Sequence, residues 1–337
     1  MRRGPAARIA RRIERDGPMP LAEFMALSNA AYYAGRDPFG RGGDFTTAPE
    51  VSQMFGEIVG LWCVDAWQRM GRPADIRLIE LGPGRGVLMA DALRAARLEP
   101  AFRPEVHLVE ISPVLRHLQL AQGFKAVWHN RPETIPDGPS IWIANEFFDA
   151  LPTRQFVRLG GYWHERLVDK GTHGFRFVAG PALRHASAGT EGGIAEVCSA
   201  AASVTAALAA RPGYGLAIDY GYGEPPERTT LQAVSKHEPV DPLSQPGEAD
   251  MSAHVDFAAL ARAAREAGAA AWGPVAQGDW LRRLGIEARA AQLGGQETAL
   301  ARLTGADAMG HLFRVLAFGP VGASAPAGFT DSERQSG

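Results

Sequence analysis

The stretch Ile76-Arg77-Leu78-Ile79-Glu80-Leu81-Gly82-Pro83-Gly84-Arg85-Gly86 decides the fold of this chain. A short apolar run ends in an acid and is followed by three glycines at alternate positions, after which a helical pattern begins near Val87. Glycine suits such a turn because the backbone visits positive φ there and because a ligand can approach without meeting a Cβ atom. The amides at the start of the helix then face that ligand. The sequence therefore predicts a strand, a turn and a helix that together bind a small molecule.

The spacing of these glycines and the acid before them indicate which ligand is bound. A dinucleotide-binding fingerprint of the form GxGxxG requires a glycine at position 87, where this chain has Val87. Glu80 would repel a pyrophosphate, but it suits a ligand that carries a cationic amino group, as S-adenosylmethionine does. A turn with a purely structural role is the alternative. The residues expected to bind the cofactor here are Glu80, Gly82, Pro83, Gly84 and Gly86.

Further apolar runs at 106–110, 141–144 and 215–219 are expected to form strands, and a last strand is expected at 311–318. Strands that alternate with helical segments predict a mostly parallel sheet with crossover helices. Glu110 ends the second of these strands, where an acid can accept hydrogen bonds from both hydroxyls of a ribose. Nicotinamide and S-adenosylmethionine sites both use an acid in this way. Glu110 is therefore expected to bind the cofactor, but its presence does not distinguish between these two cofactors. An exposed carboxylate at a strand end is the alternative.

Polar residues follow the strand at 141–144, in the order Asn145-Glu146-Phe147-Phe148-Asp149. Open α/β sheets bind ligands at the carboxyl ends of their strands, where these side chains are expected. Carboxylates there can hold a guanidinium group in a bidentate pair and orient its nitrogen toward a methyl sulfonium. We therefore predict that Asn145, Glu146 and Asp149 form the catalytic site. The alternative is that Asn145 caps the next helix while the two phenylalanines lie in the core.

The chain is expected to divide into three parts. Residues 1–71 form an N-terminal helical segment, and residues 72–320 form the main domain. The main domain carries an antiparallel hairpin insertion near 154–190, predicted from aromatic and β-branched residues around a Gly-Gly turn. It also contains a long loop over 222–250, rich in proline and glycine. The glycine and proline content of residues 321–337 predicts a disordered tail.

Two helices are predicted in the N-terminal segment. In the first, Ile9 and Ile13 face inward and the arginines face solvent, although an arginine-rich start is also typical of an organelle transit peptide. The second begins near Pro49 and ends at Gly71, and its apolar residues recur at helical intervals. Cys63 lies on the buried face of this second helix and is expected to be a core residue.

Composition and charge exclude several classes of protein. The 337 residues include 35 basic and 37 acidic side chains, and a formal net charge of −2 creates no field that attracts nucleic acid or anionic membrane. The two cysteines are far apart and fit neither a zinc site nor a disulfide framework, so no metal is expected. No apolar run reaches the roughly 18 residues that span a membrane. We expect a cytoplasmic protein, or a protein of the mitochondrial matrix if the source is eukaryotic.

Five stretches resemble motifs of the MidA-like methyltransferases, a family that includes the mitochondrial complex I assembly factor. They are residues 44–57, 80–86, 145–152, 218–221 and 252–257, and the match runs in order from about residue 17 to residue 318. The resemblance implies a class I (Rossmann-like) S-adenosylmethionine methyltransferase fold. It also implies a protein arginine methyltransferase that acts on the 49-kDa-type subunit of respiratory NADH:quinone oxidoreductase. By the same resemblance, the residues that close over the cofactor are Thr47, Pro49, Glu50 and Ser52.

The chain departs from the family pattern at Asp250-Met251-Ser252-Ala253-His254, where the family often carries Asp-Leu-Thr. His254 adds a titratable group there, and a lone histidine more often has a structural role than a catalytic one. Two other functions stay open. One is a nicotinamide-dependent oxidoreductase, which the missing glycine at position 87 disfavours, and the other is a non-catalytic assembly chaperone that binds a partner through the insertion and the loop over 222–250. Both a monomer and a homodimer are compatible with the sequence.

Overall fold

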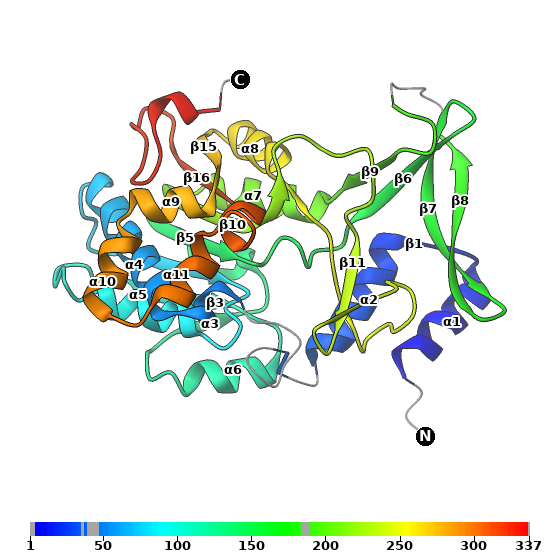
Figure 1. Cartoon of the computed structure of the whole chain (residues 1–337), viewed down its shortest axis with the longest axis horizontal. Coiled ribbons are helices and arrows are strands. Elements are labelled where there is room, and N and C mark those ends of the chain that lie inside the picture. Colours follow the sequence, from blue (N-terminus) through cyan, green and yellow to red (C-terminus); the bar gives the residue numbers. More distant parts are fainter. Residues whose placement is uncertain (1–3, 35–36, 39–46, 184–188, 336–337) are drawn as a thin grey trace.

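A mixed, mostly parallel sheet of eight strands forms the centre of the protein in the computed structural model, which describes residues 4–34, 37–38, 47–183 and 189–335 (Figure 1). The strand order is β15-β16-β10-β5-β2-β3-β4, and β14 pairs with β10. The pairs from β4 to β10 are parallel, whereas β16 runs antiparallel to both β10 and β15. The strands span Arg77–Leu81 (β2), Glu105–Val109 (β3), Val127–His129 (β4), Ser140–Asn145 (β5), Gly213–Tyr222 (β10), Val255–Asp256 (β14), Ala269–Ala276 (β15) and Phe313–Pro320 (β16).

The direction in which the chain adds strands reverses between β2 and β5. From β2 the sheet grows through β3 to β4 on one side, and from β5 it grows through β10 to β16 on the other. The loops after these two strands diverge because they lead to opposite sides, and this leaves a crevice at their carboxyl ends. Open α/β sheets bind their ligands at such a switch point.

Helices cover both faces of the sheet because successive strand residues point to opposite sides. Ile141 and Ile143 of β5 belong to one apolar cluster with α4 and α5, whereas Trp142 and Ala144 belong to another with α7 and α8. The helices span Ala48–Val51 (α3), Gln53–Arg69 (α4), Val87–Ala96 (α5), Pro113–Leu120 (α6), Ser199–Ala209 (α7), Phe257–Glu266 (α8), Gln277–Arg283 (α9), Ile286–Leu293 (α10), Glu297–Thr304 (α11) and Met309–Leu312 (α12), with a 3₁₀ turn at Pro132–Thr134 (η1).

Three segments that are far apart in the sequence form a second unit, here called the small lobe, at one end of the molecule (Figure 1). Its larger sheet has the order β1-β7-β6-β9, with β8 added to β7, and its smaller sheet has the order β12-β11-β13. An apolar cluster of its own contains Ile9, Phe24, Val168 and Met251. The elements are α1 (Pro5–Asp16), β1 (Met19–Pro20), α2 (Leu21–Ala34), β6 (Arg154–Leu159), β7 (Tyr162–Gly171), β8 (Gly174–Ala182), β9 (Ile194–Val197), β11 (Gln232–Ser235), β12 (Glu238–Val240) and β13 (Asp250–Ser252).

The structure confirms the predicted fold class and most of the predicted elements. The four strands at 76–80, 106–110, 141–144 and 215–219 are present, with ends that differ by one to three residues. Residues 1–71 are divided between the two units, because α1 and α2 pack in the small lobe while α3 and α4 pack against the central sheet. The antiparallel hairpin is also present, and residues 184–188 of the predicted insertion lie outside the described residues.

Two predictions about irregular segments were wrong. The stretch 222–250 is not a long loop, because it contains β11 and β12, and these strands pair with β13 to cover the small lobe. The tail is ordered through residue 335, since Phe329 packs into the core and the Gln335 amide donates to the carbonyl of Ala271, 2.8 Å away, on the edge strand β15. A 3₁₀ turn, η2, spans Asp331–Glu333. Glycine and proline content alone did not reveal these partners.

Strand β15 escaped prediction because it consists largely of alanines and contains Pro274, neither of which is typical of strands. Strand β9 ends at Val197, and the helix α7 begins directly after it, at Ser199.

Helices α4 and α5 lie unusually close together because two glycines of α4 face α5. A Cβ atom at Gly60 would lie 2.3 Å from the carbonyl oxygen of Ala92, and one at Gly56 would lie 2.6 Å from Cβ of Asp91. Since α5 carries the glycine-rich turn at its start and α4 follows α3, this contact sets the distance between the turn and α3.

We predict that Gly60→Ala destabilises the protein by about 1–3 kcal/mol, the usual cost of adding a methyl group to a tightly packed contact. Urea unfolding measures the effect. Leu61→Ala is the matched control, since Leu61 lies on the same helix with 41% of its surface exposed, and its cost should stay within about 0.5 kcal/mol. Equal stabilities for Gly60→Ala and the wild type would contradict the close contact.

Candidate functional site

A cavity at the switch point brings together residues from the glycine-rich turn, α3 and the end of β5. It gathers most of the residues that the sequence singled out, although they come from three separate stretches. Its lining consists of Thr47, Pro49, Glu50, Glu80, Gly82, Pro83, Gly84, Arg85, Val87, Leu88, Asn145 and Glu146. Residues 44–46 of the first motif lie outside the described residues.

The turn after β2 needs its glycines for the reasons expected. Gly82, Gly84 and Gly86 have φ values of 59°, 51° and 81°, which side chains with a Cβ atom rarely adopt. A Cβ atom at Gly82 would also lie 2.9 Å from the ring of Phe147. Gly86 is the N-cap of α5 and lies outside the cavity lining, so it shapes the turn rather than the cavity wall.

Glu80 is a buried acid with an unsatisfied oxygen at the end of β2. Its side chain is 3% exposed, and its Oε2 atom has no hydrogen-bond partner. Burial raises the pKa of this carboxyl to about 8. A cationic hydrogen-bond donor placed in the cavity would satisfy the oxygen and stabilise the charge. The amino group of S-adenosylmethionine is such a donor, so Glu80 fits this cofactor.

Glu110 follows β3 and lies next to the turn rather than in the cavity lining. Its carboxylate accepts hydrogen bonds from the amide of Ser112 at 2.7 Å and from Nε2 of Gln119 at 3.5 Å. Burial raises its pKa. The Gly82 amide donates to the carbonyl of Val109, 3.0 Å away, and therefore ties the turn to the residue before Glu110. Its contact with a ribose stays a prediction.

Asn145, the last residue of β5, and Glu146, which follows it, also line the cavity. Glu146 has a φ of 50°, a strained value for a residue other than glycine, and such strain is concentrated at functional sites. Its Oε1 atom accepts hydrogen bonds from the amide of Ala48 at 3.0 Å and from Nδ2 of Asn145 at 3.2 Å. Burial raises the pKa of Glu146 to about 7. Asn145 is 8% exposed, and its Oδ1 atom has no partner.

Asp219, within β10, positions this loop, a role that the sequence interpretation did not assign to it. Its Oδ2 atom accepts hydrogen bonds from three successive amides, those of Phe147, Phe148 and Asp149, at 3.1, 2.9 and 3.3 Å. Its Oδ1 atom accepts the amide of Tyr220 at 2.9 Å. An acid inside an otherwise apolar strand was the available signal, because a fully buried carboxylate requires donors.

Asp149 does not line the cavity, and it is close enough to Asp219 to feel its charge. Burial and the negative charges of Asp219, Asp250 and Glu146 raise its pKa. The predicted catalytic trio therefore separates into two cavity residues, Asn145 and Glu146, and one residue at the boundary with the small lobe.

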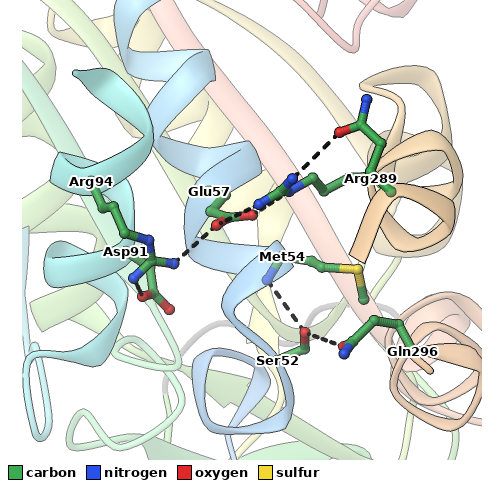
Figure 2. Close-up of polar contacts among 8 residues, drawn as sticks. Ser52, Met54, Glu57, Asp91, Arg94, Arg289 and Gln296 are labelled. Carbon is green, nitrogen blue, oxygen red and sulfur yellow. Dashed lines mark hydrogen bonds and ion pairs between the residues drawn. The ribbon is translucent and has the colours of Figure 1, made fainter. Parts of the chain in front are cut away.

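Ser52 also lies outside the cavity lining, and it connects two helical segments instead (Figure 2). Its hydroxyl caps α4 by accepting the amide of Met54 at 3.3 Å, and it donates to Oε1 of Gln296 at 2.9 Å. Gln296 precedes α11, so this contact joins α11 to the break between α3 and α4. The other residues expected from this motif, Thr47, Pro49 and Glu50, do line the cavity.

Glu57 fixes α4 relative to two other helices by means of ion pairs (Figure 2). Its carboxylate is bound by Arg94 of α5 at 3.0 Å and by Arg289 of α10 at 2.7 Å. Although burial opposes ionisation, the two arginines lower its pKa overall. Arg94 also contacts Asp91, one turn earlier on α5. The helices that surround the turn are thus held together by charge as well as by apolar packing.

Comparison with known proteins gives a consistent result. Residues 58–275 match a family described as "Putative S-adenosyl-L-methionine-dependent methyltransferase". The chain is 37% identical over 335 residues to the "Protein arginine methyltransferase NDUFAF7 homolog, mitochondrial" of Drosophila melanogaster, covering 86% of this chain and 76% of the fly protein. It is 33% identical over 321 residues to the human "Protein arginine methyltransferase NDUFAF7, mitochondrial", covering 82% and 72% of the two chains.

A solved structure is similar over nearly the whole chain. It is that of a candidate methyl transferase from Burkholderia thailandensis bound to S-adenosyl-homocysteine, with a TM-score of 0.87 and 28% sequence identity. The similarity covers 98% of this chain and 95% of that chain.

The cytoplasmic location expected from the sequence has no support from the relatives, since the fly and human proteins are both named as mitochondrial. Among the helices of the described residues, none combines the length and the apolar character needed to cross a bilayer.

We predict that Glu80→Gln changes how stability depends on pH. A carboxyl whose pKa is raised in the folded state binds more protons folded than unfolded, so stability falls as pH rises from 4.5 to about 8. Glutamine removes this contribution. The melting temperature of the variant relative to that of the unliganded wild type should therefore increase across this range and stay constant above it, as scanning fluorimetry can measure. A difference that does not vary with pH would contradict the assignment.

Proposed function

The chain belongs to this family of S-adenosylmethionine-dependent methyltransferases, and from this premise we propose that it methylates an arginine side chain of a protein. The relatives named above are protein arginine methyltransferases by name, and two thirds or more of their length is covered. As the acceptor we propose the 49-kDa-type subunit of respiratory NADH:quinone oxidoreductase, which the family resemblance implies. In a eukaryote this places the protein in the mitochondrial matrix.

The observation that carries the proposal is a pair of unsatisfied acceptors on two residues that line one cavity. Oε2 of Glu80 lies at the turn that suits the cofactor, and Oδ1 of Asn145 lies on the wall that carries Glu146. A buried acceptor without a partner costs about 1–3 kcal/mol, so two of them in one cavity favour two ligands rich in donors. An amino group and a guanidinium meet this requirement.

Positioning and proton transfer are the contributions of the protein to the reaction. When bound, S-adenosylmethionine would supply a methyl group from its positively charged sulfur to the lone pair of an acceptor nitrogen. The turn at Gly82 and Gly84 would let the backbone approach the cofactor, and Glu80 would accept a hydrogen bond from its amino group. Glu146 aligns the acceptor guanidinium. Because its pKa is about 7, this carboxylate can also receive the proton that the methylated nitrogen releases.

We predict that Gly84→Val weakens the binding of S-adenosylmethionine at least about tenfold. Gly84 lines the cavity with a φ of 51°, so valine both strains the turn and fills space that the cofactor needs. Isothermal titration measures the affinity. Gly322→Val is the matched control because a Cβ atom there meets nothing within 4 Å. Absence of micromolar binding to the wild type, or equal affinities for both variants, would refute the cofactor site.

We predict that Glu146→Gln lowers methyl transfer to arginine by roughly 10²–10⁴-fold, the usual contribution of a general base, while cofactor affinity stays unchanged. Mass spectrometry of the respiratory NADH dehydrogenase subunits, from cells with and without the gene and from cells carrying the variant, identifies the lost modification. Loss of methylation with normal assembly of the complex would favour a non-catalytic assembly role. Unchanged methylation in the variant would remove Glu146 from the mechanism.

A further inference from the structure

Arg85, in the glycine-rich turn, brings a positive charge to a cavity whose other charged lining residues are acids. The acids are Glu50, Glu80 and Glu146. Among the described residues that line this cavity, Arg85 is the only lysine or arginine. The sequence interpretation assigned Glu80 to the amino group of the cofactor and gave Arg85 no role. A basic side chain in an acidic cavity therefore requires an explanation of its own.

The amino-acid end of S-adenosylmethionine carries two opposite charges, an ammonium group and a carboxylate, on one carbon atom. The unpartnered Oε2 atom of Glu80 suits the ammonium group. The carboxylate must then lie close to that group, and it cannot lie beside Glu50, Glu80 or Glu146 without a counter-charge, because like charges repel. Arg85 belongs to the same turn as Glu80 and lines the same cavity, so it can supply this counter-charge.

The guanidinium group of Arg85 contacts two acids and keeps donors for a ligand. Its Nε atom donates to Oδ2 of Asp37 at 2.8 Å, and its Nη1 atom lies 3.7 Å from Oε2 of Glu50. A guanidinium offers five N–H donors in a planar fork, and the hydrogen bond to Asp37 uses one of them. The Nη atoms can therefore bind a carboxylate as a bidentate pair. The side chain is 36% exposed, so a ligand can reach it.

Glu50 is the weaker of the two protein partners. The 3.7 Å between its Oε2 atom and Nη1 of Arg85 is too long for a hydrogen bond. Burial raises the pKa of Glu50 overall, although the charge of Arg85 lowers it, so the charged form of this acid is disfavoured. The α-carboxyl group of an amino acid has a pKa of about 3.5 and stays ionised at neutral pH. A carboxylate of this kind would therefore be a stronger partner for the Nη atoms than Glu50 is.

The backbone that carries Arg85 is fixed by α6 and the residues that follow it. Nε2 of Gln119 donates to the carbonyl of Gly84 at 2.7 Å, and Nε2 of Gln122 donates to the carbonyl of Arg85 at 3.2 Å. Oε1 of Gln119 accepts a hydrogen bond from Nε1 of Trp128 at 2.7 Å, which holds the Gln119 amide in this orientation. The turn thus presents Arg85 from a fixed position, and such pre-organisation lowers the entropy cost of binding.

We propose that Arg85 binds the carboxylate of the cofactor through its Nη atoms while Glu80 accepts a hydrogen bond from the ammonium group. Together the two residues recognise the amino-acid end of the cofactor as a zwitterion. Arg85 is then a specificity-determining residue, because an adenosine derivative without this carboxylate leaves the guanidinium without its ligand. The inference concerns the choice of cofactor and does not depend on which acceptor is methylated.

Isothermal titration with two ligands tests the proposal. One ligand is S-adenosyl-homocysteine, and the other is its decarboxylated analogue, which keeps the adenosine, the thioether and the amino group. The wild type should bind S-adenosyl-homocysteine at least about tenfold more tightly than the analogue, because the analogue cannot form the charged bidentate pair. Arg85→Gln should weaken the binding of S-adenosyl-homocysteine at least about tenfold without weakening the binding of the analogue.

Two further variants complete the test. Arg97→Gln is the matched control because Arg97 is an exposed arginine at the other end of α5, and it should discriminate between the ligands as the wild type does. Arg85→Lys keeps the charge but lacks the planar fork, so it should discriminate less than the wild type and more than Arg85→Gln. Equal weakening of both ligands in Arg85→Gln would mean that Arg85 only shapes the turn, and it would overturn the proposal.

The comparison of the two ligands on the wild type needs no variant, so it decides the question even if Arg85→Gln does not fold. Equal affinities of the wild type for both ligands would overturn the proposal, as would binding of neither.

The outcomes also separate this inference from the proposed function. Discrimination that depends on Arg85, without methylation of any arginine, would support the role of Arg85 and refute the proposed acceptor. Arginine methylation by a wild type that does not discriminate between the ligands would support the proposed function and overturn the role of Arg85.

Discussion

The carboxylate of Asp219 is the contact on which the active region of this protein depends. It accepts three successive amides of the loop after β5 with one oxygen and the next amide of its own strand with the other. Because Asp219 is fully buried, bulk solvent does not compete for these hydrogen bonds. The loop therefore turns back toward the sheet, which brings Glu146 to the cavity and Asp149 to the small lobe. One buried carboxyl group of β10 thus positions the loop that carries the predicted catalytic residues.

Close packing of helices positions the part of the cavity that is lined by α3 and the glycine-rich turn. Without side chains at Gly56 and Gly60, α4 can approach α5 until backbone meets backbone, and the arginines on Glu57 hold α4, α5 and α10 in one arrangement. The glycine turn before α5 and the α3 segment before α4 then face each other across the cofactor space. Asp149 and Asp219 have the opposite effect on stability, since burial and neighbouring negative charges raise the pKa of both carboxyl groups. Proteins often tolerate such strain at a site where a ligand relieves it.

Much of the fold and the cofactor side of the cavity were predictable from local patterns. Strand residues repeat every second position and the turn chemistry of Gly82, Gly84 and Gly86 depends on their own backbone angles, so both are visible in a short stretch. Glu80 was predictable for the same reason, since it directly precedes the turn. The role of Asp219 was not, because its partners lie about seventy positions earlier in the chain. The close contact at Gly60 was not predictable either, because only the tertiary structure places Ala92 of α5 beside it.

By itself, the sequence determined the parallel sheet, the glycine turn with its acid and the polar residues after β5, because each depends on residues adjacent in the chain. Only the tertiary structure decided that α1 and α2, the hairpins and β11 to β13 assemble into one lobe, and that Phe329 orders a tail rich in glycine and proline. It also decided that Tyr33 and Asp250 meet, at 2.7 Å, beside Asp149. Such contacts join segments separated by many residues. The burial of apolar surface that drives these segments together is non-directional, so the sequence alone does not show which segments meet.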